Sequence, residues 1–482
     1  MAIGSAERFD MVVIGSGPAG EKAATQAAYF GKRVAIVERR ATPGGIAVSD
    51  AGIPTKTLRE TAVYLTGFRH REIYGIGLAL DARLKLERLL GRTGEVRTLM
   101  TGVVQANLER MGVEFVHGVG RLAGTGTGTG TGTSDAGHRV LVTTDTGERV
   151  LEADVVLLAP GSRPFHPPNI PFDDAAVTDS EGILGLSRLP GSLVVVGGGA
   201  VGCEYASIFR ALGVEVTLLE AAPHLLGFVD PEIADLLAET FRAQGTRVML
   251  GSGVAAIERT PRGLEVRLAS GETLMPEHVL WAGGRVGNLE GLGLADAGVV
   301  VDAKGRIQVD GDYQTSVPGI FAAGDVIGPP ALASVSMEQG RVAACHAFGI
   351  PFKDVVDPLA PFGVYSVPEV AMVGVTEPAA RAAGIDVEVG RGRFARNTRA
   401  RIAGATEGLI KLVFRRSDRV LLGVHILGDI ASELVHLGQL IVSAGRPIDY
   451  FIHATFNVPT YSEAYKYAAY DGLQRLAQPV AP

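Results

Sequence analysis

The sequence predicts an α/β protein of about three domains, and three observations support this. The chain has 482 residues, too many for one hydrophobic core at ~150 residues per domain. Short apolar strands alternate with helical segments over much of its length. A glycine-rich turn between a strand and a helix occurs twice, while the last third has none. We therefore expect two α/β domains and then an α+β domain.

The first turn runs from Gly15 to Gly20 and reads GSGPAG, between an apolar strand and an Ala-rich helix. Gly15 permits a tight turn, Gly17 lets the backbone approach a pyrophosphate, and Gly20 lets helix and strand pack closely. The helix N-terminus faces the phosphates. The following strand ends in Glu38. This order is typical of a dinucleotide-binding site of the Rossmann type.

The second turn, GGGAVG, repeats this arrangement with Gly197, Gly199 and Gly202 in the three glycine positions. Its next strand ends in Glu220. The first glycine and the strand-end acid are 23 positions apart in both copies. Two copies with equal spacing predict two nucleotide sites in one chain.

Composition and charge exclude several other functions. The formal charge of −7 and the pI near 5.9 argue against a nucleic acid partner. Cys203 and Cys345 form neither a disulphide framework nor a metal knuckle, and the ten histidines have no zinc-ligand spacing. The chain start lacks the apolar core of a signal peptide, and no run reaches the ~20 apolar residues of a membrane span. We expect a cytoplasmic protein without a resident metal.

Two further regions have a recognisable pattern. An alternating Gly-Thr tract, Gly124–Thr133, predicts a lengthened hairpin tip, because such a sequence cannot bury apolar surface. Phe362–Arg416 predicts antiparallel strands, while Ala431–Ala444 and Ser462–Leu476 have helical spacing. This mixture suits a dimerisation domain, so we expect a homodimer or higher homo-oligomer.

The whole chain resembles the pyridine nucleotide-disulphide oxidoreductases, and within them most closely the soluble transhydrogenases. The segments with this resemblance are Val201–Arg210, Tyr313–Asp325, Ala333–Arg341, Tyr365–Gly374 and Thr455–Thr460. The resemblance implies FAD as cofactor and NAD(H) and NADP(H) as substrates. It also implies an FAD domain over 1–158 and 285–355, an NAD(P) domain over 159–284 and a dimerisation domain over 356–482.

The resemblance implies particular site residues. Those that would hold FAD are Gly15, Gly17, Gly20, Glu38, Gly161, Gly324 and Asp325; those that would hold the nicotinamide coenzyme are Gly197, Gly199, Gly202 and Glu220. Gly45, Gly284 and Lys56 complete the cofactor-binding set. Lys56 and Glu204 would form an ion pair beside flavin N5, where a fixed positive charge favours anionic reduced flavin.

The chain departs from the family where disulphide chemistry needs specific residues. The two redox cysteines of the family fall on Ala47 and Gly52. The histidine of the C-terminal His-Pro-Thr motif, the acid-base for a dithiol substrate, is replaced by Val458. Electrons must therefore pass between diffusible molecules through the flavin alone.

Three functions remain open. The first is a flavin-dependent transhydrogenase that moves hydride from NADPH to NAD⁺. The second is an NAD(P)H dehydrogenase, or diaphorase, that reduces a quinone or other small acceptor. The third is a flavoprotein that has lost catalysis and serves as a binding subunit.

Coenzyme preference is a separate question. Glu220 favours NAD, because a carboxylate repels a 2′-phosphate. Binding of NADP would need a cation from elsewhere, for which Arg210, Arg242 and His224 are the candidates.

Overall fold

The computed structural model describes residues 6–67, 82–123 and 137–477. The chain divides into two compact units. Unit 1 comprises Met1–Pro54, Thr93–Phe165 and Arg285–Asp357, and unit 2 comprises Thr55–Arg92, His166–Gly284 and Pro358–Pro482. The Gly-Thr tract, for which we expect a hairpin tip, lies outside the described residues.

Unit 1 contains a seven-stranded sheet in the order β3-β2-β1-β6-β5-β4, with β17 paired to β6. Strands β3, β2, β1, β6 and β17 are parallel, whereas β5 and β4 continue the sheet antiparallel. The strands of this sheet are β1 (Glu7–Ile14), β2 (Val34–Glu38), β3 (Glu114–His117), β4 (Val119–Leu122), β5 (His138–Thr144), β6 (Gly147–Leu158) and β17 (Ile320–Ala322). Unit 1 also contains an antiparallel pair, β7 (Ser162–Pro164) and β16 (Arg285–Gly287). Its helices are α1 (Pro18–Tyr29), α2 (Gly45–Ser49) and α8 (Ala333–Ala347), with α5 (Ala82–Arg110) shared between the units.

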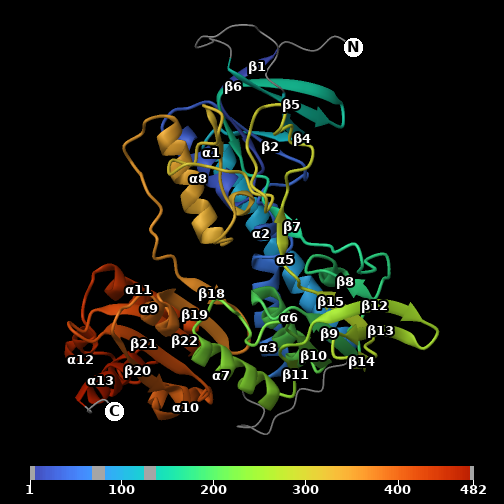
Figure 1. Ribbon diagram of the computed structural model, residues 1–482. Helices are drawn as coiled ribbons and strands as arrows, with labels where there is room; N and C mark the ends of the chain where they lie inside the picture. Colours follow the sequence, from blue (N-terminus) through green and yellow to red (C-terminus); the bar gives the residue numbers. More distant parts are fainter. Residues whose placement is uncertain (1–5, 68–81, 124–136, 478–482) are drawn as a thin grey trace. The chain divides into compact units, whose positions relative to one another are not determined.

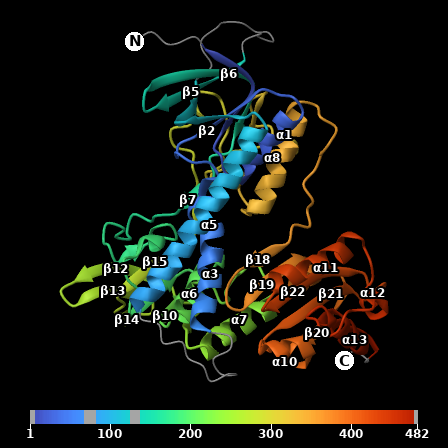
Figure 2. The same ribbon diagram turned by 180° about the vertical axis from the view of Figure 1, so that it is seen from behind.

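Both faces of the parallel part are covered. Along β1, Met11 and Val13 join one apolar cluster, while Val12 and Ile14 join another. Helices α1 and α8 lie side by side (Figures 1 and 2). Their contact is so close that a Cβ on Gly340 would come within 2.1 Å of the Ala19 carbonyl oxygen. This explains why the strands are continuous apolar runs rather than alternating ones.

Unit 2 contains a parallel sheet in the order β11-β10-β9-β15-β8 and a small antiparallel sheet, β12-β13-β14. The elements of this part are α3 (Ile53–Thr66), shared with unit 1, β8 (Val177–Thr178), β9 (Ser192–Val196), α6 (Ala200–Ala211), β10 (Glu215–Leu219), α7 (Pro231–Ala243), β11 (Arg247–Met249), β12 (Val254–Thr260), β13 (Gly263–Leu268), β14 (Thr273–Leu274) and β15 (His278–Trp281). The second predicted strand–turn–helix–strand order is therefore present as β9-α6-β10.

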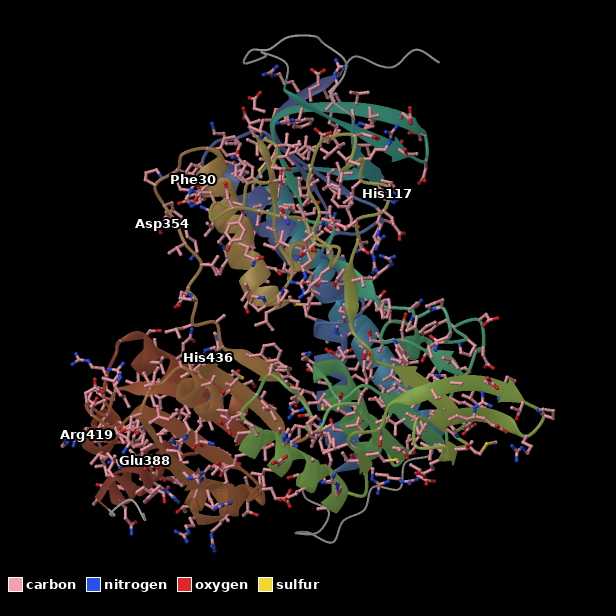
Figure 3. All side chains as sticks on the ribbon, viewed as in Figure 1. Phe30, His117, Asp354, Glu388, Arg419 and His436 are labelled. Atoms are coloured by element: carbon pink, nitrogen blue, oxygen red, sulfur yellow. The ribbon has the colours of Figure 1, made fainter. Side chains whose placement is uncertain are left out.

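The C-terminal part of unit 2 is an antiparallel sheet in the order β18-β19-β22-β21-β20. Buried residues of α11 and α13 join one apolar cluster with this sheet. Its elements are β18 (Phe362–Val364), β19 (Glu369–Gly374), α9 (Glu377–Ala382), β20 (Val387–Arg393), α10 (Thr398–Ala403), β21 (Leu409–Arg415), β22 (Leu421–Gly428), α11 (Ala431–Ser443), α12 (Asp449–His453) and α13 (Glu463–Ala477). Figure 3 labels Glu388, Arg419 and His436 on this part.

The expectation of strands throughout Phe362–Arg416 is wrong in two places, where α9 and α10 interrupt the sheet. Each short helix has a side-chain cap. The Thr376 hydroxyl accepts a hydrogen bond from the Ala379 amide, and Asn397 accepts one from Ala400. Such caps stabilise helix starts that apolar periodicity does not show. With two α/β regions and an α+β C-terminal part, the predicted fold class is confirmed.

Candidate active site

The first glycine turn connects β1 to α1 in unit 1. Gly15 has φ +102°, and a Cβ there would lie 2.2 Å from the Ala159 oxygen. A Cβ on Gly20 would lie 1.9 Å from the Gly15 oxygen. At Gly17, the N-cap of α1, no atom of the described residues lies within 4 Å of the corresponding Cβ position. The turn thus leaves a bare backbone at a helix N-terminus, which fits a pyrophosphate.

The second glycine turn, in unit 2, has the same geometry. Gly197 has φ +109°, and its Cβ would lie 2.5 Å from the Ala282 oxygen. A Cβ on Gly202 would lie 1.8 Å from the Gly197 oxygen. Within the described part of the chain, nothing comes within 4 Å of a Cβ on Gly199, the N-cap of α6. This turn fits a second pyrophosphate equally well.

The acid after each turn is held by the turn itself. Glu38 Oε2 accepts hydrogen bonds from the amide of Ser16 (2.9 Å) and its hydroxyl (2.6 Å), and Oε1 accepts from the Arg40 amide (3.0 Å). Glu220 accepts from the amides of Gly198 (2.5 Å) and Ala222 (2.7 Å). An ionised carboxylate has about four acceptor positions, so both acids can still accept from ribose hydroxyls.

Two of the predicted FAD residues, Asp325 and Gly324, are hydrogen-bonded to polar side chains of unit 1. Asp325 Oδ2 accepts from the Ser162 hydroxyl at 2.6 Å, and that hydroxyl oxygen accepts from Arg285 Nε at 2.9 Å. The Gly324 amide donates to Gln339 Oε1 at 2.8 Å. Neither Ser162 nor Gln339 was assigned a role from the sequence, although Gln339 lies in the family-like segment Ala333–Arg341.

The remaining predicted glycines take up backbone shapes that suit them. Gly45, Gly161, Gly284 and Gly324 have φ of +56°, +71°, +111° and +84°. These values lie in the region that glycine tolerates without steric cost. Around the Cβ positions of Gly161 and Gly284, the described residues leave 4 Å of open space. A close approach by a ligand is therefore possible at both.

The two positions that hold cysteines in the family, Ala47 and Gly52, lie in close backbone contact. A Cβ on Gly52 would lie 2.5 Å from the oxygen of Ala47 and 3.1 Å from its Cα. Beside them, Arg40 is ion-paired with Asp50 at 2.5 Å and also donates to the Ser49 hydroxyl. A dithiol at positions 47 and 52 would thus require a backbone shift as well as two substitutions.

The expected ion pair between Lys56 on α3 and Glu204 on α6 is present within unit 2. Lys56 Nζ lies 2.9 Å from both carboxylate oxygens of Glu204. The Glu204 side chain is 8% exposed and that of Lys56 is 34% exposed. Burying such a pair costs desolvation energy, so it is weak evidence for stability alone. A partly exposed ammonium beside a buried carboxylate is suited to a role in binding or catalysis.

The two thiols do not form a second electron store. Cys203 and Cys345 are both free and buried. Burial is the main cause that raises the pKa of each thiol above its ordinary value. Cys203 Sγ donates to the Gly198 carbonyl oxygen at 3.3 Å, which is a packing role within the second turn.

Two of the three candidate cations for a 2′-phosphate are engaged elsewhere. Arg210 lies in the last turn of α6, at the end opposite Gly199, and donates to the Gln244 and Val214 oxygens. His224 contacts Asp235 at 2.7 Å. Arg242 lies in the last turn of α7. The structure therefore brings neither Arg210 nor His224 to Glu220 as a ready partner for NADP.

The described residues contain neither a membrane-spanning helix nor a candidate metal centre. Among residues 6–67, 82–123 and 137–477, every helix is too short or too polar to cross a bilayer. The same residues contain no cluster of three or more side chains that could hold a metal ion.

Sequence comparisons identify the family of both parts of the chain. Residues 9–340 match the pyridine nucleotide-disulphide oxidoreductase family, and residues 360–469 match the dimerisation domain of the same family. A soluble pyridine nucleotide transhydrogenase from Mycobacterium bovis is 44% identical and covers 97% of this chain and 98% of its own length. A protein of the same name from Marinomonas sp. is 38% identical, with 97% and 99% covered.

Solved structures agree with these matches. LpdA from Mycobacterium tuberculosis is 30% identical, with a TM-score of 0.85 over 98% of this chain and 100% of that one. The HOCl-induced flavoprotein disulphide reductase RclA from Escherichia coli is 27% identical, with a TM-score of 0.84 over 96% and 99%. The expected FAD and nicotinamide cofactors are those of this family. The chain belongs to the pyridine nucleotide-disulphide oxidoreductases.

Proposed function

We propose that this protein is a flavin-dependent transhydrogenase that transfers hydride between NADPH and NAD⁺. The proposal rests on one observation: the chain has two intact dinucleotide-binding turns but no cysteine at positions 47 and 52. The names of its full-length relatives support the same activity. A protein built this way has sites for two nucleotides and no dithiol to pass electrons to.

The roles of individual residues are part of this proposal. The backbone at Gly17 cradles the FAD pyrophosphate and that at Gly199 the coenzyme pyrophosphate. Glu38 and Glu220 accept from the respective ribose hydroxyls. When bound, FAD supplies the two-electron carrier between the two coenzymes. The Lys56–Glu204 pair orients the nicotinamide, and the Lys56 charge favours the reduced, anionic state of the cofactor.

The same proposal covers organisation and location. We assign 1–158 and 285–355 to FAD binding, 159–284 to NAD(P) binding and 356–482 to dimerisation. The family's dimerisation domain is present over 360–469. Exposed apolar side chains on the C-terminal part, among them Leu440, Val458 and Tyr467, suit a homodimer contact. We place the protein in the cytoplasm, where free buried thiols stay reduced.

Anaerobic stopped-flow mixing tests the proposed activity. We expect NADPH to bleach the flavin absorbance of the holoenzyme, and subsequent NAD⁺ to restore it with formation of NADH. Lys56→Met should slow the bleaching step about 100-fold, because the variant loses the ammonium charge near the developing anion. Arg188→Met, which removes an exposed arginine in unit 2, is the matched control and should behave as the wild type. The proposal would be overturned if NAD⁺ failed to reoxidise the reduced enzyme.

An NAD(P)H dehydrogenase is the second candidate, and the surroundings of Glu220 favour it. This carboxylate is held by the amides of Gly198 and Ala222, and Arg210 is engaged elsewhere. Such a site suits NADH better than NADPH. If NADH bleaches the flavin, NAD(P)⁺ fails to reoxidise it and a quinone does so rapidly, this second function replaces the first.

A further inference from the structure

A segment of the C-terminal part of unit 2, Tyr365–Glu369, is bonded to the two helices that carry Lys56 and Glu204. The Val367 amide donates to the Ser207 hydroxyl on α6 at 3.2 Å. Arg59 on α3 forms an ion pair with Glu369 at 3.0 Å, and both side chains are more than nine-tenths buried. Strand β18, which leads into this segment, also contacts α6 (Figure 1). The segment is therefore fixed with respect to both helices.

Tyr365 contacts both members of the ion pair. Its backbone amide donates to Glu204 Oε1 at 3.0 Å. The Lys56 ammonium lies 5.0 Å from the centre of its ring. This distance is within the ~6 Å range of a cation–π attraction, which acts through the ring face and needs no hydroxyl. The ring therefore favours the position in which Lys56 Nζ meets both oxygens of Glu204.

The phenol group of Tyr365 has contacts of its own. Burial, with the nearby Glu369 carboxylate as a second cause, raises the pKa of the Tyr365 phenol, so the ring stays neutral. Its hydroxyl interacts with Ser432. The Ser432 hydroxyl donates to Glu369 Oε2 at 2.6 Å. The tyrosine hydroxyl is thus part of the same network as Arg59 and Glu369.

We propose that Tyr365 is a positioning residue for hydride transfer: its ring and backbone amide hold the Lys56 ammonium and the Glu204 carboxylate in their working arrangement. The inference rests on the proposed function, in which Lys56 and Glu204 serve the transfer step. It goes further by giving the C-terminal part of the chain a role in the reaction besides dimerisation.

Two substitutions separate the ring from the hydroxyl. Tyr365→Leu removes the ring, whereas Tyr365→Phe keeps it and loses the contact with Ser432. In the holoenzyme, the rate at which an amine-acylating reagent modifies Lys56, followed by peptide mass spectrometry, reports how firmly the ammonium is held. We expect a rise of about fivefold for Tyr365→Leu and less than twofold for Tyr365→Phe.

The second readout is the rate at which NADPH bleaches the flavin under anaerobic conditions. Tyr365→Leu should slow it about tenfold, with Tyr365→Phe close to wild type and Lys56→Met at least as slow as Tyr365→Leu. Tyr365→Met, an unbranched ringless variant, serves if the leucine variant does not fold, and the same values are expected for it.

Either of two results overturns the inference. One is a ringless variant with wild-type labelling and bleaching. The other is a Tyr365→Phe variant as impaired as the ringless one, because that result would show a structural role of the hydroxyl. Failure of the proposed function looks different: the wild type would be bleached by NADPH yet not reoxidised by NAD⁺, while the order of the Tyr365 variants would remain.

Discussion

The two glycine turns have the same backbone geometry, but the ion pairs that hold the chain after Glu38 and after Glu220 differ. After Glu38, the anchor is Arg40, whose ion pair with Asp50 is partly exposed. After Glu220, the chain leads to Asp230, which is fully buried. Asp230 accepts from Lys411 Nζ at 2.9 Å and from the Glu377 amide at 3.2 Å. The glycine turn therefore specifies the binding site for a pyrophosphate. Ion pairs outside the turn determine how firmly the chain after Glu38 or Glu220 is held.

Lys411 is the centre of the second anchor. It lies within 3.0 Å of carboxylates on three residues, Asp230, Glu232 and Glu377, and its side chain is 3% exposed. Burial alone would lower the pKa of Lys411, but hydrogen bonds to Glu377 and Asp230 raise it above the ordinary value. The two units thus differ: the chain after Glu220 is held by a buried charge network, and the chain after Glu38 by a partly exposed ion pair.

The largest expected effect is on ligand binding, and it distinguishes the turn at Gly17 from the turn at Gly199. Gly17 and Gly199 have φ of −66° and −73°, which any residue can adopt. Valine at either position would fill the open space without a clash, so we expect the free energy of unfolding to change by no more than ~1 kcal/mol. Gly17→Val should purify without flavin colour. Gly199→Val should stay yellow, with its Kd for NADH raised about 100-fold.

Absorbance after gel filtration and an NADH titration measure these outcomes, and Gly102→Ala on α5 is the control. A Gly17→Val protein that keeps its flavin, or a Gly199→Val protein with a normal Kd, would show that the cradles are not where the pyrophosphates bind.

The next largest effect is on stability, and it distinguishes the Lys411 network of unit 2 from the Arg40–Asp50 pair of unit 1. Lys411→Met leaves three carboxylates without their shared cation, so we expect a loss of about 3–5 kcal/mol in the free energy of unfolding. Arg40→Met breaks the more exposed pair and should cost only about 1 kcal/mol. Urea denaturation at pH 7 gives both values. Equal losses would contradict the difference between the two anchors.

Coenzyme preference gives a smaller effect. Glu220→Gln removes the charge that repels a 2′-phosphate, so we expect the ratio of the Kd for NADPH to that for NADH to fall about tenfold. Glu38→Gln is the matched variant in the first site. It should weaken flavin retention and leave the ratio unchanged. If both substitutions shift the ratio alike, the assignment of the second site to the nicotinamide coenzyme is wrong.

The smallest effect is on acid stability. Burial alone would raise the pKa of Glu232 and Glu377, but hydrogen bonds from Arg391, Arg381 and Lys411 lower both values. Carboxylates with a lowered folded pKa stabilise the protein above the unfolded value of about 4.3 and lose that contribution as pH falls below it. We expect stability to decrease from about pH 4.5 downward. Urea denaturation between pH 6 and 3.5 should show a shallower decrease for Lys411→Met; an unchanged slope would contradict the charge network.

The sequence predicted what depends on local spacing. It predicted both glycine turns and the acid that ends the strand after each, while the Lys56–Glu204 pair followed from the family resemblance and is present. It missed α9 and α10, because their caps are single polar residues in an otherwise strand-like pattern. It also missed Tyr365, Ser162 and the Asp230–Lys411 pair. Each has a partner at least 161 positions away in the chain, and no periodic pattern records such contacts.

Counting electrons tests the central claim most directly, namely that the flavin is the sole electron store of this protein. In an anaerobic titration of the holoenzyme with dithionite, we expect one electron pair per flavin to bleach the absorbance completely, with no long-wavelength band of a thiolate beside the flavin. Uptake of a second pair before bleaching is complete, or the appearance of such a band, would contradict the account.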